Sequence, residues 1–222
     1  MNTYDINSNQ YILEKLIGKA LLDAAMWTNK KCTPRKPQEP DYVAMLSTKF
    51  VKDFFNVLVA VFPHYDFSIV GVYCHQKPIV DIKEAKKPEL GDILFVYADR
   101  KRKGEMVLNS LLLQAKISKN PWLHVHQSER HQLKLYKNWP QFTYCRAGNL
   151  NGKMRNIFPK TINDGAQYLL IADNLLANGF FAGNRMFPMG CAIPDDILYI
   201  NDSLSRACLK IKNCTKHLFL SP

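Results

Sequence analysis

Hydrophobic residues near the start of the chain recur at helical spacing. Within residues 9–27 they lie three or four positions apart, at Ile12, Leu13, Leu16, Ile17, Ala20, Leu21 and Ala24. This spacing predicts an amphipathic helix. A basic, proline-rich stretch at residues 29–40 then indicates an exposed connector. A second helix is expected over residues 41–62, because Pro40-Asp41 suits a helix start and Pro63 ends the helix.

Apolar runs of strand length follow the two helices. Residues 67–74 and 78–82 are short and rich in β-branched side chains, which favours strands. Residues 91–98 and 106–117 are almost continuously apolar and flank a polar connection that ends in glycine, as in a hairpin. Because these two runs lack polar alternation, we expect both strands to lie centrally in a sheet with cover on each face.

The pattern becomes less regular toward residue 222. Residues 126–138 suit a helix, residues 141–145 and 165–172 suit strands, and the signal weakens beyond residue 175. The predicted strands cluster and do not alternate one for one with helices. We therefore expect a mixed α/β fold, with a central mixed β-sheet flanked by helices, two N-terminal helices and a C-terminal extension.

Polar residues stand at the ends of the predicted hairpin. Asp92 begins its first strand, and Gln114-Ala115-Lys116 ends its second. A hairpin brings these ends together, and strand residues two apart share a face. The side-chain oxygens of Asp92 and Gln114 and the carbonyl oxygen of Ala115 suit Mg²⁺ or Mn²⁺, and Lys116 could orient a water and stabilise a phosphate. The alternative is a hairpin whose polar ends are simply solvated.

These residues resemble the motifs of the PD-(D/E)xK nuclease superfamily. Asp92, preceded by glycine, is similar to the aspartate motif of the RecB-like branch, and Gln114-Ala115-Lys116 is similar to the second motif, with glutamine in place of the usual acid. Gln132 and Tyr136 form a Q-x3-Y arrangement similar to one that contacts DNA in that branch. The resemblance implies a restriction-endonuclease-like core over residues 1–150, with residues 151–222 as an extension packed on it in one compact unit.

The resemblance also implies a further acid at the metal, taken from an early helix. Glu14 matches that role by its position, and Glu89 is a second candidate. The implied catalytic residues are Asp92, Gln114, Lys116 and Glu14, and the implied metal ligands are Asp92, Gln114, Ala115 and Glu14. The alternatives are a solvated acid at Glu14 and a core side chain at Tyr136. The glutamine removes one negative charge from the site, so either another acid compensates or the enzyme is weakened.

The chain is strongly basic, with 30 Lys and Arg against 19 Asp and Glu and a net charge of +11. Such an excess favours a polyanion as partner, and the resemblance implies DNA, with double-stranded DNA favoured. The basic run at the predicted hairpin tip is expected either to contact the DNA backbone or to be a solvated loop. This run consists of Arg100, Lys101, Arg102 and Lys103.

No stretch of the sequence predicts export or membrane insertion. Apolar runs fall short of the ~20 residues that cross a bilayer, and residues 1–10 lack the pattern of a signal peptide. The six cysteines are scattered and form no CxxC pair, which favours reduced thiols. We therefore expect a cytoplasmic protein.

Two functions of different classes fit the sequence. The first is a metal-dependent DNA nuclease that hydrolyses phosphodiester bonds, in phage defence or DNA processing, acting alone, as a homo-oligomer or under a regulatory partner. The second is a catalytically weakened nucleic-acid-binding or assembly protein on the same fold.

Overall fold

The computed structural model describes residues 3–74, 76–84, 86–100, 106–157, 165–173, 180–182 and 185–210. Its helices are α1 (Thr3–Ser8), α2 (Gln10–Cys32), α3 (Glu39–Ser47), α4 (Lys49–Val61), α5 (Arg130–Asn138) and α6 (Leu204–Lys210), with short 3-10 helices η1 (Gln127–Glu129) and η2 (Gly148–Leu150). Its strands are β1 (Ile79–Asp81), β2 (Ile93–Arg100), β3 (Met106–Ser118), β4 (Trp122–His124), β5 (Phe142–Arg146), β6 (Met154–Arg155), β7 (Ala166–Ala172), β8 (Phe180–Ala182), β9 (Arg185–Phe187), β10 (Met189–Ala192) and β11 (Ile197–Ser203).

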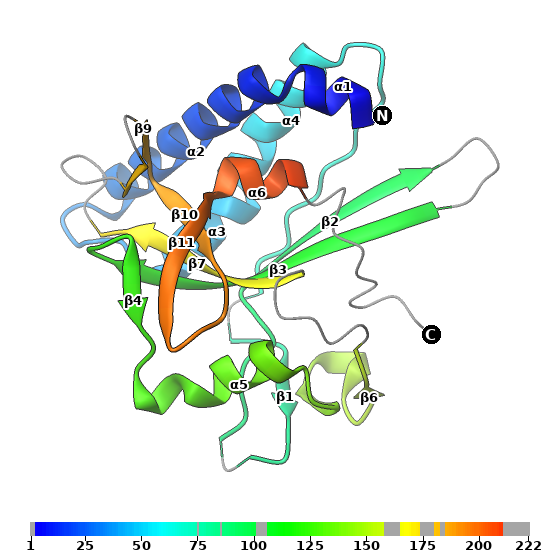
Figure 1. Cartoon of the computed structure of the whole chain (residues 1–222), viewed down its shortest axis with the longest axis vertical. Coiled ribbons are helices and arrows are strands. Elements are labelled where there is room, and N and C mark those ends of the chain that lie inside the picture. The colour runs from blue at the N-terminus through cyan, green and yellow to red at the C-terminus, as the bar shows by residue number, and fades with distance from the viewer. Residues whose placement is uncertain are drawn as a thin grey trace.

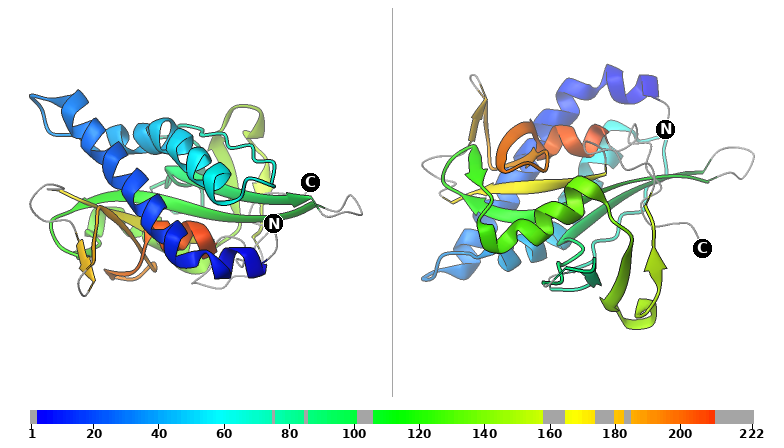
Figure 2. Two further views of the ribbon diagram at one scale, coloured as in Figure 1. Left: turned by 90° about the horizontal axis from the view of Figure 1, so that it is seen from above. Right: turned by 60° about the horizontal axis from the view of Figure 1, so that its bottom comes forward.

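A mixed sheet of six described strands forms the centre of the fold. Its order is β2-β3-β7-β10-β11-β4, with β3 antiparallel to β2 and parallel to β7. Helices α2, α3 and α4 cover one face of the sheet and α5 lies on the other (Figure 1 and Figure 2). Strands β1, β5 and β6 form a small separate sheet. The expected class, a mixed α/β fold with helices on both sides of a mixed sheet, is confirmed.

The N-terminal helices keep the predicted apolar face but not the predicted boundaries. The buried side of α2 includes Leu13, Ile17 and Leu21, all at most 2% exposed, whereas Ile12, also expected on this face, is 43% exposed. The second predicted helix is divided into α3 and α4, because Thr48 between them has φ −125° and ψ −81°, outside the helical region. Within the described part of the chain, the structure contains no helix both long enough and apolar enough to span a bilayer.

The two strands of the predicted hairpin differ in their burial. β3 is central, and Leu113 and Ala115 on it are fully buried. β2 is the edge strand of the sheet, so Leu94 and Val96 are 40% and 51% exposed. The expectation that both strands are covered on each face is therefore wrong for β2.

The strand expected at residues 67–74 is not present. Gly71 in this segment packs directly on α3, where an added Cβ would come within 1.8 Å of the carbonyl oxygen of Ser47. The hydroxyl of Ser47 also donates to the carbonyl oxygen of Val72 at 3.2 Å. These contacts hold the segment against the helices, and it does not join the sheet.

The sheet continues across the boundary expected at residue 150. Strands β7, β10 and β11 all follow that boundary and supply half of the six-stranded sheet, with β7 directly beside β3. Three described strands of the region expected to be an extension packed on the core are therefore part of the central sheet itself.

Candidate active site

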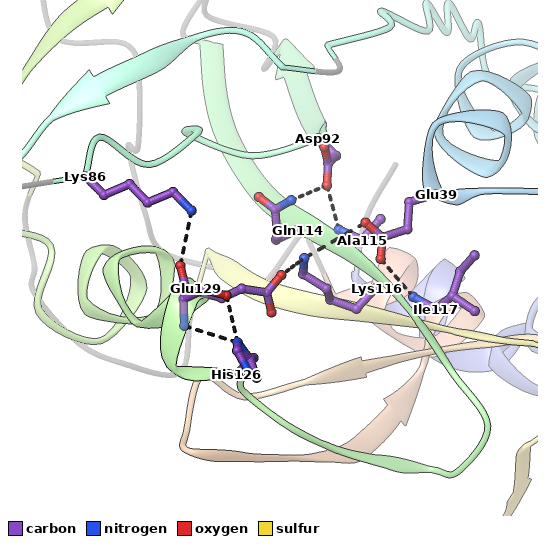
Figure 3. Close-up of polar contacts among 10 residues, drawn as sticks. Glu39, Lys86, Asp92, Gln114, Ala115, Lys116, Ile117, His126 and Glu129 are labelled. Carbon is purple, nitrogen blue, oxygen red and sulfur yellow. Dashed lines mark hydrogen bonds and ion pairs between the residues drawn. The ribbon is translucent and has the colours of Figure 1, made fainter.

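Four segments meet at the end of β3 that β2 leaves unpaired. The antiparallel ladder with β2 ends before Gln114, and from there β7 is the only described strand that pairs with β3. Asp92 precedes β2, Glu39 begins α3, and Glu129 ends η1 just before α5. Figure 3 shows these three acids arranged around Lys116 and the adjacent edge of β3.

Asp92 is buried and bound to the second predicted motif. Asp92 is only 2% exposed. Its Oδ2 accepts two hydrogen bonds, from Nε2 of Gln114 at 2.5 Å and from the main-chain N–H of Ala115 at 2.8 Å. The proximity expected from the hairpin is confirmed. The amide of Gln114 turns its nitrogen toward Asp92, however, and its oxygen Oε1 is buried without a hydrogen-bond partner among the described residues.

The open edge of β3 is closed by two carboxylates. The main-chain groups of Ala115 and Ile117 point away from β7, because those of the alternate residues bond to β7. Asp92 accepts from the first of these N–H groups, and Oε1 of Glu39 accepts from the second at 3.2 Å. The carbonyl oxygen of Ala115 points out of the same edge between the two carboxylates. The edge therefore gathers oxygen atoms of the kind that bind hard cations.

Lys116 is held as an ammonium group among the three acids. Its Nζ lies 2.5 Å from Oε1 of Glu129 and 3.9 Å from Oε2 of Glu39, and its side chain is 17% exposed. Burial lowers the pKa of Lys116, but the nearby carboxylates of Glu39, Glu129 and Asp92 outweigh burial and raise the pKa above its usual value. Three carboxylates around one ammonium leave an excess of negative charge, which favours a bound cation.

The early-helix acid at this site is Glu39 and not Glu14. Oε1 of Glu14 accepts from Gln10 at 2.8 Å and from Nε of Arg206 on α6 at 3.0 Å, so the expectation that Glu14 joins the metal ligands is wrong. The reason is packing: this part of α2 faces α6, whereas α3 packs on β3. The sequence signal that points to Glu39 is an acid between two prolines at a helix start, in the connector.

An ion pair in the connector fixes the start of α3. The guanidinium of Arg35 donates to both carboxylate oxygens of Asp41, at 2.6 and 2.7 Å. This hydrogen bonding is the main cause that lowers the pKa of Asp41 to about 2. A cleft of about 400 Å³, lined in part by Lys36, Glu39 and Asp173, opens beside the ion pair. The connector is exposed at residues 33–36, as expected, and its residues 36–40 also form a wall of this cleft.

Gln132 and Tyr136 are core residues, so the expectation that they contact DNA is wrong for this structure. Tyr136 is fully buried, its hydroxyl donates to the carbonyl oxygen of Leu90 at 3.0 Å, and its ring stacks on Trp139. Burial raises the pKa of Tyr136, with Tyr168 as a further cause. Gln132 is 6% exposed. One helical turn separates the pair as predicted, but that face of α5 packs on the sheet.

Glu89, the second candidate for the extra acid, lies on the chain that leads into Asp92. Its backbone pairs with Ile79 of β1 in an isolated bridge. Its carboxylate is also near enough to Tyr136 to contribute a small part of the raised tyrosine pKa. These contacts place Glu89 beside the small sheet, and a metal-binding role for it stays a prediction.

Three buried polar atoms lie on the α5 side of the sheet. Gln114 is opposite Tyr168 in the parallel ladder, and Gln132 reaches this face from α5. Oε1 of Gln114, Nε2 of Gln132 and the hydroxyl of Tyr168 have no hydrogen-bond partner among the described residues. Each such atom costs on the order of 1–3 kcal/mol unless water or a ligand binds it. This cost indicates a region that is not optimised for stability alone.

The basic hairpin tip falls mostly outside the described residues. Lys101, Arg102 and Lys103 are not described, and for Arg100 only the main chain at the end of β2 is described. DNA contact at these four positions stays a prediction. The wider charge pattern is clear from the sequence: residues 76–157 hold sixteen of the 30 Lys and Arg but only seven of the 19 Asp and Glu.

No protein-family model, no curated protein and no solved structure matches this chain. Among the described residues, no group of three or more His, Cys, Asp or Glu side chains is arranged to hold a metal ion. The oxygen atoms at the β3 edge include amide and carbonyl groups, which are outside that set. The function must therefore be argued from the geometry of this site.

Proposed function

We propose that this chain is a metal-dependent nuclease that hydrolyses phosphodiester bonds in DNA. The observation that carries the proposal is the convergence of Asp92, Gln114, the Ala115 carbonyl and Lys116 at one open strand edge. The order of elements around it also supports the resemblance to the PD-(D/E)xK superfamily. An antiparallel hairpin, β2–β3, is followed by helix α5 and by β7, parallel to β3.

The donor atoms at the edge fit Mg²⁺ or Mn²⁺. The carboxylates of Asp92 and Glu39 and the carbonyl of Ala115 are hard oxygen ligands, and such ions complete their coordination with water and substrate phosphate. Gln114 fits this set after a half-turn of its amide, which would give a partner to the oxygen that has none among the described residues. When bound, the ion would polarise the phosphate and lower the pKa of a bound water.

The side chains around the edge have separate roles in the proposed reaction. Because the three acids keep Lys116 protonated, this residue is suited to bind a phosphate oxygen and stabilise negative charge in the transition state. It is not suited to remove a proton from water in this state. Glu129 holds the Lys116 ammonium in position, and Asp92 is fixed by its two hydrogen bonds. The excess of basic residues in 76–157 would supply affinity for the DNA backbone.

One feature favours the second candidate function, a nucleic-acid-binding or assembly protein without catalysis. Gln114 already satisfies Asp92 through its nitrogen, and Glu129 already satisfies Lys116. The contact of Gln114 with Asp92 would compete with a cation, and the contact of Glu129 with Lys116 would compete with a phosphate.

Cleavage of plasmid and linear double-stranded DNA with Mg²⁺ or Mn²⁺ separates the two functions. We expect cleavage by the unmodified chain, and a loss of at least about 100-fold in Asp92→Asn and in Lys116→Ala. Lys119→Ala, which removes an exposed lysine just beyond the same strand, serves as the matched control and should keep full activity.

Two results would count against the nuclease. Cleavage that survives both substitutions would assign the activity to another site or to a contaminant. Binding of DNA by all four proteins without any cleavage would favour the non-catalytic alternative.

A further inference from the structure

A group of aromatic side chains lies on the strand pair β4–β11, at the opposite end of the described sheet from β2. Trp122 is 40% exposed and Tyr199 is 62% exposed, although Trp is on average highly buried in folded proteins. In the antiparallel ladder Tyr199 is opposite Trp122, and Ile197 is opposite His124. Residues directly opposite each other share a face of the sheet, so these side chains form one surface. We call it the aromatic patch.

The alternation along the two strands shows that the aromatic patch faces away from the core. Leu198 is fully buried, and Leu123, which is opposite it, packs against the core. The residues on either side of these two leucines therefore point outward. The rings of Trp122 and His124 meet edge to face, with centroids 5.5 Å apart and planes at 85°. This contact orients the indole ring and still leaves much of it accessible.

The chain on both sides of β4 leads to the candidate active site. β3 ends at Ser118, two residues after Lys116, and η1, which ends at Glu129, follows β4 (Figure 1). An extended chain spans at most about 3.6 Å per residue, so the Cα atom of Trp122 lies within about 22 Å of that of Lys116. By the same measure His124 lies within about 18 Å of Glu129. At 3.4 Å per nucleotide of one strand, about six nucleotides cover these distances.

The surroundings of the aromatic patch favour an anionic partner. β4 lies within residues 76–157, where basic residues outnumber acids by sixteen to seven. The two acids just before β11 are paired with basic side chains. Asp195 lies 2.8 Å from Nζ of Lys137, and Asp196 lies 3.9 Å from the guanidinium of Arg130. Their negative charges are therefore partly offset.

Accessible flat rings in a basic region fit nucleic acid with unpaired bases. A base stacked on an aromatic side chain contributes about 1–3 kcal/mol, and every base offers such a face. In a duplex the neighbouring bases cover these faces, so only an unpaired base can stack on Trp122 or Tyr199. Such rings also occur in protein interfaces. The excess of positive charge and the short connection to Lys116 favour nucleic acid over a protein.

We propose that the aromatic patch binds unpaired bases of a DNA substrate whose backbone lies at the β3 edge. The substrate class would then be a duplex with a single-stranded tail, in preference to a blunt duplex. Trp122 and Tyr199 would stack on bases of the tail, and His124 would hold Trp122 in position. The place of the cleaved phosphate rests on the proposed function, whereas binding of bases to the patch does not require cleavage.

The test measures binding by the fluorescence anisotropy of labelled DNA in EDTA, which prevents metal-dependent cleavage. The probes are a blunt duplex and the same duplex with a tail of about eight nucleotides, which is long enough to span the distances above. We expect the unmodified chain to bind the tailed duplex at least about tenfold more tightly than the blunt duplex, because one or more bases stack on the rings.

Trp122→Leu combined with Tyr199→Leu removes both rings and keeps both side chains apolar. This variant should bind the tailed duplex about tenfold more weakly, and it should bind the blunt duplex as the unmodified chain does. The unchanged affinity for the blunt duplex also shows that the variant is folded. Trp122→Phe with Tyr199→Phe keeps the rings and should keep most of the preference for the tail. If the double leucine variant does not fold, Tyr199→Leu alone removes the more exposed ring.

Trp27→Leu is the matched control. Trp27 on α2 is 42% exposed, close to the value for Trp122, and its ring faces the ammonium of Lys31, 5.7 Å from the ring centroid. This variant should keep the preference for the tailed duplex. The slope of log affinity against log salt should be equal in all variants, because the rings contact bases and not phosphates.

Three results would overturn the inference. The first is equal binding of the two probes by the unmodified chain, and the second is an equal loss in Trp27→Leu and in the double leucine variant. The third is dimerisation in sedimentation that the double leucine variant abolishes, without any preference for the tail, which would assign the patch to a second copy. A preference for the tail that depends on the rings, in a chain that cuts no DNA with Mg²⁺ or Mn²⁺, would support the patch and overturn the proposed nuclease.

Discussion

The two strands of the β2–β3 hairpin each have an open edge, and the side chains that face these two edges differ. Beyond Gln114, the unpaired N–H groups of β3 are bound by the carboxylates of Asp92 and Glu39. Along β2, the outer edge borders an apolar groove that is also lined by Leu46 of α3 and Phe50 of α4. Charged side chains therefore face one edge, and apolar side chains border the other.

This difference shows that acids at a strand edge can have a structural task of their own. The carboxylates of Asp92 and Glu39 satisfy main-chain donors that no described strand pairs, so they would be favourable here without any cation. Two features distinguish the β3 edge from a merely capped edge: the excess of acid around Lys116, and the oxygen of Gln114, which has no hydrogen-bond partner in the described part of the chain. The following predictions test this contrast, from the largest expected effect to the smallest.

Asp92→Ala should have the largest effect on stability. It leaves the N–H of Ala115 and the amide of Gln114 buried without their acceptor, so the free energy of unfolding should fall by about 3 kcal/mol. Urea denaturation at neutral pH measures this fall. The control is Asp23→Ala, which removes an exposed acid on α2 and should change the free energy by less than about 0.5 kcal/mol. A fall below about 1 kcal/mol for Asp92→Ala would mean that the carboxylate does not cap the edge.

Gly71→Ala should destabilise the protein by displacing residues 67–74 from α3. The new Cβ would overlap the main chain of Ser47, so the segment must move, at a cost of about 2 kcal/mol. Gly18→Ala is the matched control, because its Cβ would have 4.0 Å to the nearest atom, in Ser205, and should stabilise α2 by about 0.5–1 kcal/mol. Thermal unfolding of both variants measures the difference. Equal melting temperatures would show that the contact of Gly71 with Ser47 does not hold residues 67–74 in place.

Glu39→Gln should weaken binding of Mn²⁺ by about tenfold, because one of the two carboxylates that flank the Ala115 carbonyl loses its charge. Glu14→Gln should leave binding unchanged, since Glu14 is engaged by Arg206 on α6. Isothermal titration calorimetry on the two variants and the unmodified chain measures both affinities. The opposite order of effects would restore Glu14 as the early-helix ligand.

Arg35→Gln should produce the smallest effect, confined to acid pH. Asp41 has a pKa of about 2 in the folded chain against an ordinary 3.8, so its pairing with Arg35 stabilises the fold above pH about 4. That stabilisation is lost as the pH falls from about 4 to about 2. Urea denaturation across this range should therefore show the variant and the unmodified chain converging at low pH. A difference in the free energy of unfolding that stays constant at all pH values would show that the contribution of Arg35 does not depend on the ionisation of Asp41.

The sequence predicted the parts of the site that depend on neighbours along the chain. The hairpin of β2 and β3 is a local structure, so the proximity of Asp92 and Gln114 followed from two apolar runs and a polar turn. The buried face of α2 followed in the same way from its periodicity. The positions of Gln132 and Tyr136 on one helix face were also correct, but the sequence could not tell whether that face meets solvent or the sheet.

Other parts of the site required contacts between segments distant in the sequence. Glu39 and Glu129 reach Lys116 from α3 and η1, across 77 and 13 positions of the chain, and no local pattern relates either acid to Lys116. Glu14 was favoured by its place on an early helix, but the packing of α2 against α6 directs it elsewhere. The choice among such acids depends on helix packing, which periodicity does not specify.

The sequence by itself determined the mixed α/β class, the hairpin, and the meeting of Asp92 with Gln114, because turns and hydrophobic periods act over a few residues. The tertiary structure decided which acids surround Lys116, which strand of the hairpin became the edge, and why residues 67–74 stay outside the sheet. These outcomes depend on how whole helices pack and on single close contacts such as Gly71 against Ser47. Packing of that kind depends on contacts among many segments that are distant in the sequence, so no short stretch of sequence specifies it.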